Sequence, residues 1–131
     1  MINNPYLKYQ QSAVQTASPA QQLIMLYDGA IRFLRSALEA VETRNIESAN
    51  ANIQKAQAII HEFVALLDFT YPVAKDLANI YEYMLHQLIQ ANLTKSMEPI
   101  QEVLNHMIDL RETWVQANKQ SVGERSNMTH A

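Results

Sequence analysis

Apolar side chains recur every three or four positions along four stretches of this chain, and that spacing places them on one face of a helix. The second stretch is the clearest, with Ile46, Ala49, Ile53, Ala56, Ile60, Phe63 and Leu67 in register. Only 2 glycines and 4 prolines interrupt the 131 residues, so helix propensity is high nearly throughout. The sequence therefore predicts an all-α protein.

Capping signals indicate where the helices begin. Ser18, Pro19 and Gln21 have the order of a capping box with proline in the first turn. Asn45 can cap the second helix, Pro72 breaks the chain before the third, and Ser96 can cap the fourth. We expect helices at about residues 19–43, 46–67, 73–93 and 97–120.

Short connections between long helices favour antiparallel neighbours, so we predict an antiparallel up-and-down four-helix bundle over residues 18–120. Asn4 before Pro5 can begin a helix, and residues 1–17 are therefore expected to form a short N-terminal helical arm. Residues 121–131 include Gly123 and lack an apolar period, so we expect a disordered tail there.

Charge and composition exclude several classes of partner. The formal net charge is −3 and Lys and Arg form no run, so nucleic acid is an unfavourable partner. The sequence has neither a secretion-type start nor an apolar run of about 18 residues, so we expect a cytoplasmic chain that does not insert into the membrane. Cysteine is absent, which excludes disulfides and thiolate chemistry.

The motifs of catalysis and metal binding are incomplete. His61 and Glu62 begin like the zinc motif HExxH, but Ala65 replaces its second histidine. A di-iron bundle needs Glu-x-x-His, whereas the Glu–His pairs at 82 and 86 and at 102 and 106 are four apart and suit solvated helix faces. We therefore expect no catalytic residue, no metal, no cofactor and no enzymatic activity.

The segment LIMLYDGAIRFL, residues 23–34, carries more apolar surface than one packing seam needs. Its apolar arc is roughly 200°, whereas a surface helix usually needs about 100°. Either two neighbouring helices bury the whole arc, or part of it lines a groove for a partner helix. Gly29 in mid-helix is compatible with a close approach by another backbone, at a groove beside Leu26, Gly29 and Phe33, and Asp28 with Arg32 suits a surface pair.

Several motifs resemble the flagellin-specific secretion chaperones of the FliS family. They are NPYLKYQQ at 4–11, TASPAQQLIMLYDGAIRFLRSAL at 16–38, ANANIQKAQAIIHEF at 49–63, LANIYEYMLHQLIQAN at 77–92 and LRETW at 110–114. The resemblance covers nearly the whole chain apart from its tail.

The resemblance implies a cytoplasmic, non-enzymatic chaperone that binds the carboxyl-terminal segment of flagellin. Such a chaperone prevents premature polymerisation and delivers flagellin to the flagellar type III export gate. The alternative is a helix-bundle adaptor for another amphipathic protein segment. The free chain is expected to be a monomer or a weak homodimer.

Helical angles select the residues that would line the flagellin-binding groove. The candidates are Ile24, Tyr27, Ile31, Phe33, Ile59, Leu66, Leu85 and Ile89. The resemblance further implies that the N-terminal arm, with Tyr6 and Tyr9, can cap part of this groove.

Overall fold

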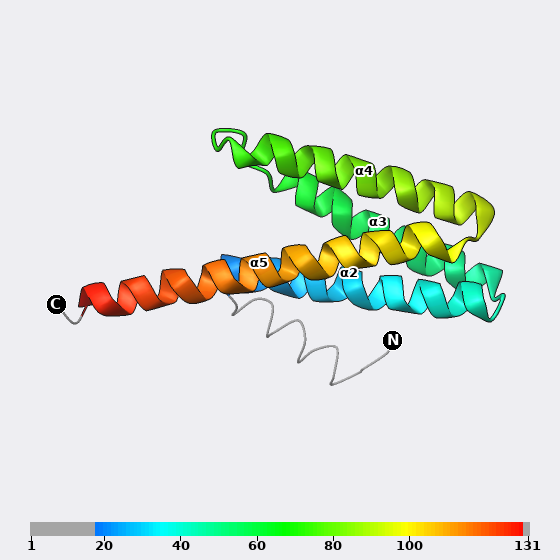
Figure 1. The fold of residues 1–131 in the computed structure, drawn as a ribbon, viewed down its shortest axis with the longest axis horizontal. Coiled ribbons are helices and arrows are strands. Elements are labelled where there is room, and N and C mark those ends of the chain that lie inside the picture. Colours follow the sequence, from blue (N-terminus) through cyan, green and yellow to red (C-terminus); the bar gives the residue numbers. More distant parts are fainter. Residues whose placement is uncertain (1–17, 130–131) are drawn as a thin grey trace, which may run out of the picture.

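The structure, a computed structural model, describes the backbone of residues 18–129 and the side chains of residues 18–120. Four long helices make up the described residues (Figure 1). They are α2 (Pro19–Glu42), α3 (Ile46–Ala65), α4 (Val73–Thr94) and α5 (Met97–Thr129). The arm predicted at residues 1–17 lies outside the described residues.

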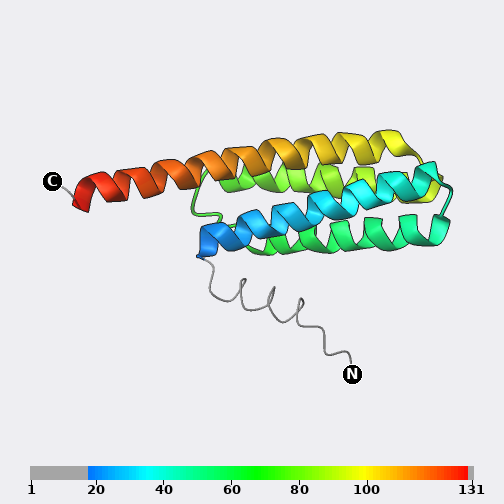
Figure 2. The same cartoon turned by 90° about the horizontal axis from the view of Figure 1, so that it is seen from below.

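Successive helices run in opposite directions, as their colours show from blue at the start of α2 to red at the end of α5 (Figures 1 and 2). α2 packs against α3 and α5, and α4 packs against the same two helices, so the four close into a ring. The prediction of an all-α, antiparallel four-helix bundle is confirmed.

The starts of the first two helices follow from local hydrogen bonds. The Gln21 N–H donates to Ser18 Oγ at 3.2 Å, and the Ser18 N–H donates to Gln21 Oε1 at 3.0 Å, which completes the capping box. The Ser48 N–H donates to Asn45 Oδ1 at 3.1 Å in the same way. Caps of this kind stabilise a helix by about 1 kcal/mol each, so these boundaries can be read from sequence.

Two residues in the left-handed backbone region help the chain to reverse direction. Arg44 has φ 60° and Lys95 has φ 50°, a conformation that costs a residue with a Cβ roughly 1–2 kcal/mol. At Lys95 the ammonium group donates to the Asn92 carbonyl oxygen at 2.6 Å and also to the Asn92 side-chain oxygen. These bonds satisfy acceptors in the last turn of α4 and offset part of that cost.

The core contains apolar and aromatic side chains from all four helices, and no charged side chain among those described is buried. Its fully buried members include Leu34, Ile53, Met84, Leu88 and Met107. Apolar burial, at about 25 cal/mol per Å², is therefore the main contribution to folding.

An ion pair and an amide hydrogen bond link the helices outside this core. Arg111 on α5 donates to Asp28 on α2 at 2.5 Å, and Asn92 on α4 donates to Asn50 on α3 at 2.7 Å. The expected pairing of Asp28 with Arg32 is therefore wrong. Helical spacing identifies neighbours on the same helix, whereas the partner that Asp28 finds lies on another one.

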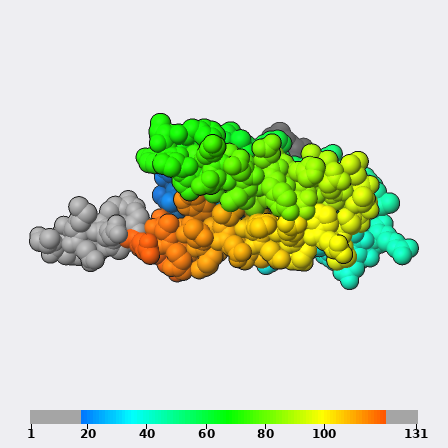
Figure 3. Space-filling model, turned by 45° about the horizontal axis from the view of Figure 1, so that its top comes forward, coloured from blue at the N-terminus to red at the C-terminus, as the bar shows by residue number. Residues whose placement is uncertain are grey.

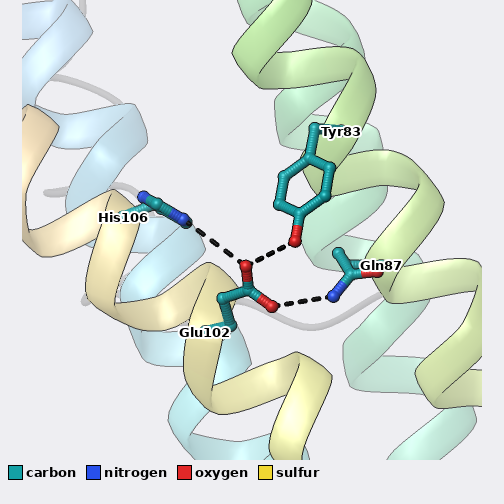
Figure 4. Close-up of polar contacts among 4 residues, drawn as sticks. All are labelled: Tyr83, Gln87, Glu102 and His106. Carbon is teal, nitrogen blue, oxygen red and sulfur yellow. Dashed lines mark hydrogen bonds and ion pairs between the residues drawn. The ribbon is translucent and has the colours of Figure 1, made fainter.

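Glu102 joins α5 to α4 through a small polar cluster (Figure 4). Its carboxylate accepts hydrogen bonds from the Tyr83 hydroxyl at 2.5 Å and from the Gln87 amide at 2.8 Å. His106 Nε2 lies 3.8 Å from Oε1 of Glu102. The hydrogen bond from Tyr83, with that from Gln87, holds the pKa of Glu102 below its ordinary value. Glu102 and His106 are the solvated pair of one helix that their spacing predicts.

α5 continues to Thr129, so the prediction of a disordered tail at residues 121–131 is wrong as far as the described backbone reaches. The apolar seam ends earlier, but a helix that is already formed extends at small cost through residues such as Glu124 and Arg125. Gly123 lowers the helix propensity without ending the helix. Figure 2 shows α5 running on past the end of the four-helix body.

Gly29 is buried where α2 packs on α3. A Cβ added to it would lie 3.3 Å from Cδ1 of Ile59, a tight contact that the end of the Ile59 side chain would relieve by shifting a few tenths of an ångström. The close approach to Gly29 is therefore made by a side chain of α3 inside the bundle, and not by another backbone as the sequence suggests.

We expect Gly29→Ala to raise the free energy of unfolding by about 0.5–1 kcal/mol, because alanine has the higher helix propensity and the end of Ile59 is flexible. Urea denaturation measures this change. Gly29→Leu is the matched control and should destabilise, since its longer side chain cannot be accommodated by a small shift. A loss of stability in Gly29→Ala would show that Ile59 cannot move.

Candidate functional site

Large apolar side chains remain exposed around the α3–α4 connection and along α4. They include Leu66, Phe69, Tyr71 and Val73 at the connection, and Ile80, Ile89 and Leu93 on α4. Figure 3 shows the face on which α4, in green, lies beside α5, in yellow and orange. Leu66, Tyr71 and Val73 line one cavity and therefore lie close together, and a group of exposed apolar side chains of this kind can mark an interaction site.

A cavity of about 350 Å³ opens beside the α3–α4 connection. The first turns of α2 and α4 and the middle of α5 meet there (Figure 3). The lining residues are Leu23, Phe63, Leu66, Leu67, Asp68, Tyr71, Val73, Ala74, Leu77, Tyr81 and Trp114. A small, largely apolar cavity with few polar groups is typical of a binding pocket.

One aromatic side chain from each helix forms a cluster at the base of this cavity. These four residues, called here the aromatic cluster, are Tyr27 on α2, Phe63 on α3, Tyr81 on α4 and Trp114 on α5. The Phe63 ring stacks on Tyr27 at 4.3 Å and on Tyr81 at 5.4 Å between centroids. The hydroxyl oxygens of Tyr27 and Tyr81 are 2.5 Å apart, and Trp114 Nε1 donates to Tyr27 at 3.2 Å.

The cluster is held away from water, and this changes how its tyrosines ionise. Burial raises the pKa of Tyr27 and of Tyr81 above the ordinary value of 10.0, because it disfavours the phenolate. Both hydroxyls are therefore neutral hydrogen-bonding groups throughout the physiological range.

Asp68 places a carboxylate at the rim of the cavity. The Thr70 hydroxyl and the Thr70 N–H donate to Asp68 Oδ1 at 2.6 and 3.0 Å. These hydrogen bonds lower the pKa of Asp68, so the rim carries a negative charge at neutral pH. The cavity thus combines an apolar interior with one acidic group at its edge.

Two of the residues predicted to line an exposed groove belong to the core instead. Tyr27 is 0 % exposed and Ile31 is 7 % exposed, so the prediction was wrong for both. α2 is covered by α3 on one side and by α5 on the other, and together these neighbours bury most of its broad apolar arc. Periodicity gives the angle of a side chain around its helix but not the number of helices that cover it.

The other predicted residues differ in their exposure and in the helix that carries them. Leu66, which is 64 % exposed, is the only one of them that lines the cavity. Ile89 is half exposed and Leu85 half-buried on α4, while Ile24 is half-buried on α2. The remaining two, Phe33 and Ile59, are half-buried side chains that pack against the core.

Sequence reasoning missed most of the cavity because its residues come from four helices and a connection. Leu23, Tyr81 and Trp114 each fit the apolar period of their own helix, which indicates packing but not that the three meet at one cavity. One signal was available, since Phe69 and Tyr71 are aromatic residues in a short connection, where polar residues are usual.

No group of His, Asp and Glu side chains in the described part of the chain is arranged to hold a metal ion. Within residues 18–129, none of the helices is long and apolar enough to cross a membrane. What the described residues offer is a rigid helical scaffold with an exposed apolar surface and a preformed cavity. These features define a helical-bundle protein-binding module.

Comparison with known proteins gives the family. Residues 2–121 match the family described as flagellar protein FliS. The flagellar secretion chaperone FliS of Bacillus subtilis (strain 168) is 38 % identical over 116 residues, covering 88 % of this chain and 87 % of the relative. The chain belongs to the FliS family.

Two further relatives carry the same name. The flagellar secretion chaperone FliS of Salmonella typhimurium is 33 % identical over 119 residues, which cover 88 % of each chain. That of Campylobacter jejuni is 32 % identical over 117 residues, covering 87 % of this chain and 91 % of the relative. The similarity therefore extends over most of the length of both chains.

The raised pKa values of Tyr27 and Tyr81 predict a loss of stability at alkaline pH. In the unfolded chain both tyrosines ionise near pH 10, whereas in the folded chain they keep their protons. Their contribution is thus complete below pH 10 and declines as the pH rises above it. Urea denaturation between pH 8 and 11.5 measures this decline.

Tyr81→Phe should lower the free energy of unfolding by about 1 kcal/mol at pH 8, because one buried hydrogen bond is lost. It should also make the alkaline decline shallower, since one of the two shifted groups is removed. Tyr71→Phe removes the hydroxyl of an exposed tyrosine and serves as the control. Equal slopes for Tyr81→Phe and the unmodified chain would contradict the prediction.

Proposed function

We propose that this chain is a flagellar secretion chaperone that acts in the cytoplasm and binds the carboxyl-terminal segment of flagellin. Binding would prevent premature polymerisation, and the complex would be delivered to the flagellar type III export gate. Membership of the FliS family is the observation that carries the proposal. The family is one of chaperones, so no enzymatic activity is assigned.

The exposed apolar surface supports this proposal on physical grounds. An amphipathic client helix can place its apolar anchors on the exposed side chains of α4 and of the α3–α4 connection. A segment that folds as it binds loses conformational entropy, and the burial of apolar surface must exceed that cost. The proposed contact residues are Leu66, Leu85 and Ile89. Ile24, Phe33 and Ile59, half-buried on α2 and α3, are proposed as further contacts.

Isothermal titration with a peptide spanning the carboxyl-terminal segment of flagellin from the same organism tests the proposal. Saturable one-to-one binding with a negative heat-capacity change is expected, because binding buries apolar surface. A peptide with its apolar anchors replaced by serine is the control. A folded chain that does not bind the flagellin peptide but binds another amphipathic segment would instead be a helix-bundle adaptor.

Ile89→Asp should weaken binding of this peptide about tenfold while leaving helicity unchanged, because Ile89 is half exposed and its replacement places a charge in an apolar contact. Gln90→Asp introduces the same charge at the next exposed residue and serves as the matched control. Ile31→Asp, in the core, should unfold the chain. Full affinity in Ile89→Asp would remove this part of α4 from the proposed contact surface.

The role of residues 1–17 as a cap over the client site, with Tyr6 and Tyr9, remains a prediction. Deleting residues 1–15 is expected to leave client affinity unchanged or to increase it, since a competing segment is removed. Titration of the shortened chain with the same peptide measures this effect. Weaker binding would show that the arm contributes directly to the client site, and sedimentation of both chains would test whether the free chain is a monomer or a weak homodimer.

A further inference from the structure

The aromatic cluster contains one more donor hydrogen than its hydrogen bonds use. The Trp114 indole and the two tyrosine hydroxyls each supply one hydrogen, which makes three. Two hydrogen bonds join these groups, from Trp114 to Tyr27 and between Tyr27 and Tyr81. One hydroxyl hydrogen therefore has no acceptor among the side chains described for residues 18–120 or the backbone described with them.

Tyr27 and Tyr81 are almost equally buried, at 0 % and 2 % exposed, so the position of the cavity indicates which hydroxyl keeps the free hydrogen. Tyr27 is 0 % exposed and does not line the cavity, so a free hydrogen there would be enclosed without an acceptor, which is costly. Tyr81 lines the cavity. The favoured arrangement has Tyr27 donating to Tyr81, so that the Tyr81 hydroxyl can donate to a group that enters the cavity.

The rest of the cavity restricts what that group can be. Its walls are apolar side chains such as Leu23, Leu77 and Ala74, so the entering group must be mostly apolar. Asp68 adds a carboxylate at the rim, which favours a positive charge on the part of the ligand that stays outside.

We propose that this cavity receives the last turn of a helix of the client segment, with one bulky apolar side chain inserted as an anchor. A main-chain carbonyl of that turn accepts a hydrogen bond from the Tyr81 hydroxyl, and a Lys or Arg of the client forms an ion pair with Asp68. The inference rests on the proposed function, since it specifies how the client is held.

The end of a helix has all three features at once. Its last four carbonyl groups lack partners within the helix, so one is free to accept from Tyr81. Lysine and arginine are favoured near this end, because it carries the negative pole of the helix dipole. An amphipathic helix also places an apolar side chain beside these groups. The cavity therefore matches a helix end better than the middle of a helix, whose carbonyl groups are already bonded, or an acidic or fully polar segment.

Trp114 is the one tryptophan of the chain and lines the cavity, so it reports directly on occupancy. The experiment titrates the full chain with a tryptophan-free peptide of the flagellin carboxyl-terminal segment and follows both heat and Trp114 fluorescence. We expect both signals to saturate together. Heat without a fluorescence change would show that the client binds elsewhere, which overturns this inference and leaves the proposed function intact, whereas no binding of either kind overturns both.

Two variants test the specific contacts. Tyr81→Phe should lower the affinity for the peptide about 3- to 10-fold. Tyr83→Phe removes an α4 hydroxyl that is bonded to Glu102 outside the cavity, and it should leave the affinity unchanged. Asp68→Asn should weaken it about 2- to 5-fold and reduce the dependence of affinity on salt. Asp109→Asn, at an exposed position on α5, is its matched control.

Asp68 is exposed, so we expect Asp68→Asn to leave the fold intact. This variant therefore tests the proposal even if Tyr81→Phe lowers the stability of the fold. Unchanged affinity and salt dependence in Asp68→Asn, together with full affinity in a folded Tyr81→Phe, would overturn the assigned contacts. Weakening in both variants, with both controls unaffected, would establish them.

Discussion

The aromatic cluster is the contact on which both the fold and the cavity depend. It takes one side chain from each helix, Tyr27, Phe63, Tyr81 and Trp114, and joins them by ring stacking and two hydrogen bonds. Aromatic pairs at these distances add to the free energy of apolar burial, and the buried hydroxyls bond to each other. Three of the residues that hold the helices together at this end, Phe63, Tyr81 and Trp114, therefore also line the cavity.

The helices could be predicted because their signals are local. Ser18 and Asn45 each make a cap within three residues, and the apolar period identifies the buried face of every helix. The end of α5 could not be read in the same way, since no tertiary contact or cap is needed for a formed helix to extend past its apolar seam. A sequence pattern therefore predicts which part of a helix is packed more reliably than it predicts the residue at which the helix ends.

The candidate site was predicted less well, because its residues are brought together by packing between helices. Tyr27 and Ile31 have the angular position of groove residues, yet α3 and α5 cover them. Asp28 pairs with Arg111, which is far away in the sequence, and Gly29 accommodates Ile59 from α3. Each of these outcomes depends on which helix lies next to α2, and one sequence does not give that directly.

The two parts of the apolar surface can contribute differently to client binding. The base of the cavity is buried and held by hydrogen bonds, so its shape is fixed before a client arrives and little entropy is lost there. Leu66 and Tyr71, which line the cavity, are exposed and lie in or beside a connection, so their side chains can adjust to different client side chains. In the proposed complex, the base of the cavity would select one anchor and the exposed side chains around it would tolerate different neighbouring sequences. This division would allow one scaffold to hold a client that is unfolded before it binds, and to release it once that single anchor is withdrawn.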